Sequence, residues 1–151
     1  MCPTLKGDAL VILLVEDSEE HAELILRGIQ QQRVGNRIIH VNDGQKALDY
    51  LYRVGEYNDD DAYPMPDCLL LDLRLPRVDG LEVLRRVKSD DDLKHIKVAT
   101  LTTSSADKDL ASAEEYRADS YLVKPLDANM FNALMEELGF YWLLWKKTPG
   151  D

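Results

Sequence analysis

The sequence has few cysteines and no long apolar runs, and its 18 basic residues are outnumbered by 28 acidic ones. Its 151 residues include two cysteines, Cys2 and Cys68, which predict free thiols in a reducing, cytoplasmic environment rather than a disulfide framework. The N-terminus lacks the apolar core of a signal peptide, and no apolar run is long enough to span a bilayer. The net charge of −10 argues against binding to nucleic acid or to an anionic membrane surface.

Two kinds of ligand motif are also absent. The sequence contains neither G-x-G-x-x-G nor G-x-x-x-x-G-K-S/T, so it does not bind nucleotides through those loops. The histidines His21, His40 and His95 have no metal-ligand spacing, and we assign them no role. The acidic runs 59–61 and 90–92 lie in polar stretches without a partner cation, which is typical of solvated loops.

Short apolar runs alternate with amphipathic segments five times along the chain. The predicted strands are Ala9–Glu16, Arg37–Val41, Asp67–Leu71, Ile96–Leu101 and Asp119–Val123. Helices are predicted, in chain order, after Ser18, over Asp43–Val54, over Asp79–Lys88, from Ser105 and from Asp127. In the helix over Asp43–Val54, Leu51 and Tyr52 are expected on the apolar side. This alternation predicts a single-domain α/β fold of the flavodoxin-like (βα)5 type, a doubly wound parallel sheet with strand order 2-1-3-4-5.

Polar residues follow the apolar runs where the predicted strands end. They are Glu16 and Asp17, Asn42 and Asp43, Asp72, Thr102, and Lys124. Ligands of such sheets bind at this edge, and an all-oxygen cluster of acids suits Mg²⁺. Asp72 could then attack phosphorus, while Lys124 and the Thr102 hydroxyl neutralise the phosphoryl oxygens. Taken singly, each acid could instead cap a turn or lie in the first turn of a helix.

Four motifs together resemble the receiver domain of two-component response regulators. They are VEDS with Glu16 and Asp17, LLLDLRLPRVDG with Asp72, LTTS with Thr102, and YLVKP with Lys124. The resemblance covers nearly the whole chain and implies a phosphorylation switch, in which a sensor histidine kinase donates a phosphoryl group to an aspartate. Such a protein is a signalling phosphoacceptor rather than an enzyme, and phosphorylation changes its affinity for partners.

The resemblance also implies roles for individual residues. Asp72 is similar to the phosphoacceptor, and the ligands of Mg²⁺, or of Mn²⁺ in its place, are expected to be Glu16 through water, Asp17, Asp72 and the backbone carbonyl of Arg74. Thr102 and Tyr121 match the switch residues, Lys124 matches the phosphate-contacting lysine, and the Lys124–Pro125 bond is expected to be cis. Departures from the family pattern are Arg74, Thr103 and Arg117, where smaller residues are usual.

A narrower resemblance concerns the pathway. The loop before the third strand, the LTTSSADKDL segment and the aromatic C-terminus are similar to stand-alone response regulators of bacterial, cyanobacterial-type phytochrome kinases. No output domain follows Asp151, so residues 1–151 are expected to form one stand-alone receiver domain. Two alternatives stay open: a small phosphatase or phosphotransferase of the haloacid-dehalogenase type, and a phosphate-independent interaction module of the same fold.

The C-terminus is unusually aromatic. A helical extension is predicted over 139–147, and it includes Phe140, Tyr141, Trp142, Leu144 and Trp145. A helix that is apolar all round must be buried all round or leave an exposed patch of interface size. We therefore expect a homodimer built on this extension. The alternative is that the extension folds back over its own sheet edge.

Overall fold

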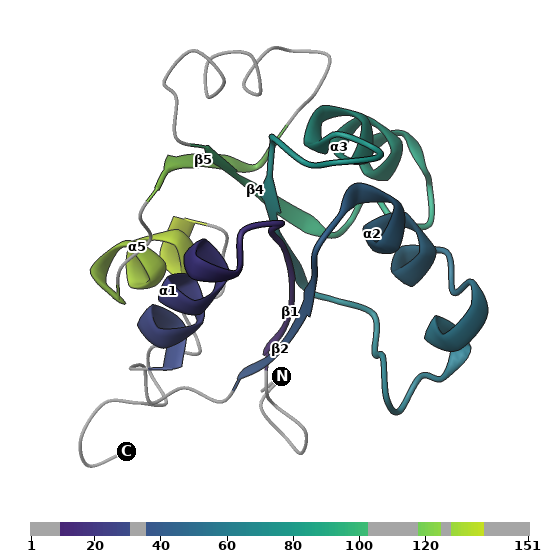
Figure 1. The fold of residues 1–151 in the computed structure, drawn as a ribbon, viewed down its shortest axis with the longest axis horizontal. Helices are drawn as coiled ribbons and strands as arrows, with labels where there is room; N and C mark the ends of the chain where they lie inside the picture. The colour runs from purple at the N-terminus through teal and green to yellow at the C-terminus, as the bar shows by residue number, and fades with distance from the viewer. Residues whose placement is uncertain (1–9, 31–35, 103–117, 125–127, 138–151) are drawn as a thin grey trace.

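Five parallel strands form the sheet that positions the other described elements (Figure 1). The structure is a computed structural model and describes residues 10–30, 36–102, 118–124 and 128–137. The strands are β1 (Leu10–Val15), β2 (Asn36–Val41), β3 (Cys68–Asp72), β4 (Lys97–Thr102) and β5 (Ser120–Val123). Their order is β2-β1-β3-β4-β5, and every neighbouring pair is parallel. The predicted fold class and strand order are confirmed.

Helices cover both faces of the sheet. They are α1 (Glu19–Gln30), α2 (Gly44–Leu51), α3 (Gly80–Ser89) and α5 (Ala128–Glu137), with a short 3₁₀ helix η1 (Gly55–Asn58). In Figure 1, α1 and α5 lie together on one face, and α2 and α3 lie on the other. No described helix is long and apolar enough to cross a membrane. The helix predicted from Ser105 and the extension predicted over 139–147 lie outside the described residues.

The alternating direction of strand side chains divides the core into two layers. All five residues of β3 are buried, as expected for a central strand of a parallel sheet. The layer between the sheet and helices α1 and α5 contains Ile12, Leu14, Leu70, Ala99 and Leu101 from the strands and Leu134 from α5. The layer between the sheet and helices α2 and α3 contains Leu13, Val15, Leu69, Leu71 and Val98 from the strands and Val83 and Leu84 from α3. Burial on both faces explains why the strands are continuous apolar runs rather than alternating ones.

The second helix ends earlier than the sequence predicts. It stops at Leu51 rather than Val54, and Arg53 adopts a left-handed conformation with φ 61°. Tyr52, predicted on the apolar side, is 43% exposed, whereas Tyr50 is fully buried and its hydroxyl donates to Pro64 O at 2.6 Å. The cause is a tertiary contact. The loop after α2 folds back over the helix, and the backbone carbonyl of Pro64 accepts a hydrogen bond from the buried Tyr50.

Some acids of the runs 59–61 and 90–92 form ion pairs that the sequence did not predict. Asp60 forms an ion pair with Arg53, and Asp91 Oδ1 lies 3.0 Å from Lys94 Nζ. Every acid of the two runs except Asp90 is exposed, so these pairs contribute little to stability. The expectation of no partner cation was wrong, but the interpretation as solvated segments holds.

A tight turn returns the chain over the end of β3. Gly80 N donates to Leu73 O at 3.1 Å, and Asp79 caps α3 by accepting from Glu82 N at 3.0 Å. A Cβ atom on Gly80 would lie 2.3 Å from Asp72 O and 2.6 Å from the Cα of Leu73. The first turn of α3 is therefore packed directly against the backbone of Asp72, and only glycine fits there.

This close approach to backbone atoms predicts that Gly80→Ala destabilises the protein by about 2–3 kcal/mol, the upper part of the usual cost of overpacking. Gly55→Ala is the matched control. Gly55 has φ +63°, but a Cβ there meets nothing within 4 Å, so the expected cost is only the backbone strain of about 1 kcal/mol. Urea unfolding measures both free energies. Equal losses in the two variants would contradict the packing argument.

Candidate functional site

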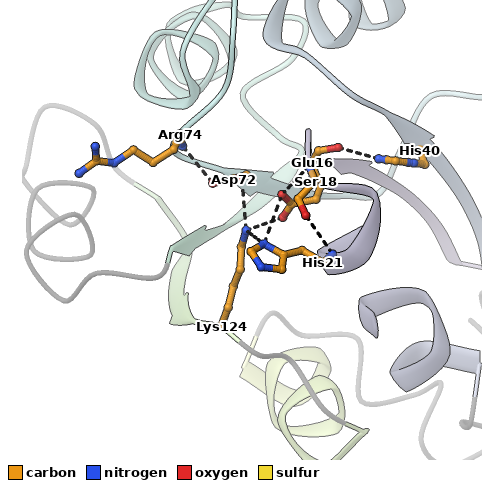
Figure 2. A network of polar contacts seen from close by, with 7 residues as sticks. All are labelled: Glu16, Ser18, His21, His40, Asp72, Arg74 and Lys124. Atoms are coloured by element: carbon orange, nitrogen blue, oxygen red, sulfur yellow. Dashed lines mark hydrogen bonds and ion pairs between the residues drawn. The ribbon is translucent and has the colours of Figure 1, made fainter. Parts of the chain in front are cut away.

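The carboxyl ends of the strands bring four charged side chains together, three of which are drawn in Figure 2. Glu16 and Asp17 follow β1, Asp72 is the last residue of β3, and Lys124 follows β5. The register pairs Val15 with Leu71, which sets Glu16 beside Asp72 on neighbouring strands. Lys124 is fixed at the same edge because its backbone N–H donates to Thr102 O at 2.7 Å. The predicted meeting of these residues at one sheet edge is confirmed.

The three acids form a compact oxygen cluster. One carboxylate oxygen of each of Glu16, Asp17 and Asp72 lies within 4.8 Å of the others. Glu16 and Asp72 are buried, while Asp17 is exposed. A hollow of about 220 Å³ opens beside them, lined by Glu16, Asp17, Ser18, His21, Asp72, Arg74 and Lys124. Carboxylates this close repel one another unless a cation lies between or beside them.

Lys124 provides one such cation. Its side chain is 9% exposed, and its Nζ lies 2.6 Å from Glu16 Oε1 and 3.3 Å from Asp72 Oδ2. The contact with Glu16 is an ion pair without hydrogen-bond geometry, since Glu16 Oε1 has no hydrogen-bond partner. Lys124 does donate a hydrogen bond to Asp72 Oδ2. The ammonium thus balances one of the three negative charges.

Asp72 has the clearest electrostatic strain in the cluster. Burial, with a smaller contribution from the adjacent Glu16, raises the pKa of its carboxyl group to about 6. The backbone N–H of Arg74 donates to Asp72 Oδ1 at 2.9 Å and opposes this rise in pKa, as does the charge of Lys124. A cation bound beside the carboxylate would lower this pKa in the same way as Lys124 does.

The residues present fit a magnesium ion. Mg²⁺ prefers oxygen ligands and keeps several waters, so it needs few protein ligands. The carboxylates of Glu16, Asp17 and Asp72 can supply them, and the buried Glu16 Oε1, which lacks a hydrogen bond, can accept a further charged partner. The ligand role of the Arg74 carbonyl stays a prediction, because the contact that the structure records uses the Arg74 amide.

The remaining residues predicted for the site do not belong to the acidic cluster itself. Thr102 is buried at the end of β4, and Tyr121 on β5 is 37% exposed, with its Cα opposite Thr100 rather than Thr102. Asp43 does not join the acids: its side chain caps α2 by accepting from Lys46 N at 2.7 Å. Pro125 and the aromatic extension lie outside the described residues, so the cis peptide bond and the dimer interface stay predictions.

Two histidines that the sequence left without a role contact the site. His40 Nε2 lies 2.7 Å from the backbone O of Glu16, and His21 Nδ1 lies 3.1 Å from Lys124 Nζ. The sequence signal was weak: His21 lies in the first turn of the helix that begins shortly after Glu16 and Asp17. Ligand spacing alone could not find this contact, since the partner of His21 is 103 residues away.

Comparison with known proteins identifies the family. Residues 12–136 match the model of the response regulator receiver domain. The chain belongs to this family. Receiver domains are signalling modules of two-component systems, so the predicted family and response-regulator function are confirmed.

Two known proteins are similar to this chain over most of their length. A protein of Methanothrix harundinacea, named probable methanogenesis regulatory protein FilR2, is 43% identical over 143 residues, which cover 95% of this chain and 90% of that protein. Response regulator Rcp1 of Synechocystis is 35% identical over 133 residues, covering 88% of each chain.

Solved receiver structures give the same result. The bacteriophytochrome response regulator AtBRR has a TM-score of 0.80 at 40% identity, covering 89% of this chain and 95% of that one. The Mn²⁺-bound form of Rcp1 has a TM-score of 0.71 at 36% identity, covering 89% of this chain and 94% of that one.

The raised pKa of Asp72 predicts a pH-dependent effect of Asp72→Asn on stability. In magnesium-free buffer, ionising Asp72 costs the folded state more than the unfolded state, so wild-type stability falls as pH rises from about 4 to 6. The variant escapes this cost. It should match wild type near pH 4 and be about 2 kcal/mol more stable at pH 7.

Urea unfolding in the presence of a chelator measures this difference. Asp91→Asn is the control, because the Asp91 side chain is 91% exposed and its replacement should give no such pH dependence. A stability difference between Asp72→Asn and wild type that stays constant between pH 4 and 7 would show that Asp72 is not strained.

Proposed function

We propose that Asp72 accepts a phosphoryl group from the phosphohistidine of a sensor histidine kinase, with Mg²⁺, and that phosphorylation changes the affinity for a downstream partner. The observation that carries the proposal is the position of the Lys124 ammonium, which contacts both Asp72 Oδ2 and Glu16 Oε1 beside an open hollow. A cation poised beside a nucleophilic carboxylate is what phosphoryl transfer needs.

The contacts suggest different tasks for the two oxygens of Asp72. Oδ1 accepts from the Arg74 amide, which fixes the carboxylate plane, while Oδ2 faces Lys124. In the proposed reaction a carboxylate oxygen forms the new bond to phosphorus, and the phosphorus–nitrogen bond of the donor breaks, leaving its electron pair on the imidazole. Lys124 and the Thr102 hydroxyl would stabilise the charge on the phosphoryl oxygens.

The metal would be held by Glu16, Asp17, Asp72 and the backbone carbonyl of Arg74. When bound, Mg²⁺ supplies neutralising charge for the carboxylates and for the phosphoryl oxygens. Mn²⁺ is a comparable oxygen-seeking cation, and a solved relative, Rcp1, is described in its Mn²⁺-bound form. That likeness supports the assignment of a divalent cation to this site.

The proposed kinase partner is of the phytochrome type. Support comes from the solved relatives AtBRR and RtBRR, which are described as bacteriophytochrome response regulators. FilR2, which is named for the regulation of methanogenesis, is 43% identical, so identity at this level does not by itself select a pathway. The phytochrome input therefore rests on the structural relatives, whereas a histidine kinase donor follows from the receiver family.

The chain lacks one acid that the phosphatase alternative requires. Haloacid-dehalogenase enzymes need a second acid two positions after the nucleophile, and that position holds Arg74. Arg74 is exposed and contributes its backbone amide to Asp72. No general acid is therefore available from that position to protonate a leaving group. The interaction-module alternative predicts instead that Asp72 is never phosphorylated.

Incubation with acetyl phosphate, followed by intact-mass measurement, tests the proposal. Wild type should gain one phosphoryl group with Mg²⁺ and none with a chelator, because the carboxylates repel the anionic donor without the cation. Asp72→Asn should gain none, while the exposed control Asp91→Asn should behave as wild type. Phosphorylation of Asp72→Asn at the wild-type rate would refute the assignment. Repeated turnover of a small phosphate ester would support the phosphatase instead.

The sequence of the aromatic extension supports a further proposal, that the full chain is a homodimer. Aromatic residues are enriched at interface cores, and the extension over 139–147 has too many to place on one helix face. Sedimentation of the full chain should show a dimer at tens of micromolar, and a chain ending at Leu138 should show a monomer. A monomer in both cases would leave the extension a purely intramolecular role.

A further inference from the structure

The hydrogen bonds of the Lys124 ammonium single out His21. Lysine carries three N–H donors and no acceptor. Among the described residues, its hydrogen bonds go to Asp72 Oδ2 at 3.3 Å and to His21 Nδ1 at 3.1 Å, while Glu16 makes only the ion pair. His21 is therefore the one partner in this set that is not a carboxylate, as Figure 2 shows.

The position of His21 is fixed by the start of α1. The Ser18 Oγ accepts from the backbone N–H of His21 at 3.2 Å, and the Ser18 N–H donates to Glu16 Oε2 at 3.2 Å. The imidazole is 44% exposed and lines the hollow at the cluster.

The contact also assigns a role to the Nδ1 atom of His21. An ammonium can only donate, so in this contact Nδ1 is the acceptor, as in the tautomer that carries its proton on Nε2. Glu16 Oε2 lies 3.8 Å from the same Nδ1, which is too far for a hydrogen bond that would compete for this atom. Lys124 is therefore the hydrogen-bond partner of Nδ1.

A neutral acceptor suits this place for an electrostatic reason. The cluster already contains three carboxylates, and the phosphoryl donor that must enter the hollow is itself an anion. A fourth carboxylate could also hold the ammonium, but it would add to the repulsion of the donor. An imidazole holds the ammonium through a lone pair and adds no negative charge. It also competes weakly for Mg²⁺, which prefers oxygen.

We propose that His21 is a positioning residue for phosphoryl binding, acting through Lys124. The inference rests on the proposed function. The lysine side chain is long and flexible, and its two carboxylate partners are the groups expected to bind the cation. The hydrogen bond to His21 Nδ1 keeps the ammonium facing the hollow when those carboxylates bind the cation. The ammonium is then already oriented toward the position of the phosphoryl oxygens.

Two variants separate the acceptor from the shape of the side chain. In His21→Asn the amide oxygen can occupy the position of Nδ1, so the acceptor is kept. In His21→Leu the bulk is kept and the acceptor is lost. The probe is beryllofluoride, a stable mimic of a phosphoryl group on a carboxylate, whose binding is titrated at saturating Mg²⁺. The affinity for Mg²⁺ alone is measured in parallel, and thermal unfolding checks that each variant folds.

His21→Leu should weaken beryllofluoride binding about tenfold, in line with the loss of a hydrogen bond to a charged group. His21→Asn should stay within about twofold of wild type, and neither variant should change the affinity for Mg²⁺. In a Lys124→Ala background, His21→Leu should have no further effect, because His21 acts through Lys124.

Three results would overturn the inference. They are wild-type beryllofluoride affinity in His21→Leu, equal losses in the Leu and Asn variants, and an undiminished effect of His21→Leu in the Lys124→Ala background. A wild-type protein that binds Mg²⁺ but no beryllofluoride would instead overturn the proposed function, which distinguishes the two failures.

Discussion

The buried contact of Lys124 with the carboxylates of Glu16 and Asp72 is the constraint on which the rest of the structure depends. Charges are costly to remove from water, so each must find a partner of opposite sign at the place where it is buried. Glu16, Asp72 and Lys124 come from the ends of three strands, and the parallel sheet, with β1 beside β3 and β5 two strands further on, brings them to one edge. The strand order therefore determines which charged residues meet at the site.

This arrangement leaves the metal-free protein with an unfavourable charge distribution. Three acids share one ammonium, and burial of Asp72, with a smaller contribution from Glu16, raises the pKa of its carboxyl group. The backbone cannot relax to separate the charges, because Gly80 packs against the carbonyl of Asp72 and the Arg74 amide fixes its carboxylate. Burying acids so close together costs stability, which is a common feature of functional sites.

The sequence was sufficient for the parts of the fold that follow from local patterns. The buried run that ends at Asp72 predicts a central strand, and the rule that ligands bind at the carboxyl edge places Asp72 beside Glu16 and Lys124. What it missed depends on contacts between distant segments. His21 meets Lys124 across 103 residues, and Tyr50 rather than Tyr52 is buried because a later loop folds over α2. No periodicity within one helix carries that information.

The central claim is that Asp72 forms an aspartyl phosphate, and the most direct test is to locate the modified residue chemically. Borohydride reduces the carbonyl carbon of an aspartyl phosphate and converts that residue to homoserine. After phosphorylation with Mg²⁺ and acetyl phosphate, reduction and peptide mass mapping should find homoserine in place of Asp72 and unchanged aspartate at Asp17 and Asp79. Homoserine at another position, or a phosphoryl group that borohydride leaves in place, would contradict the account.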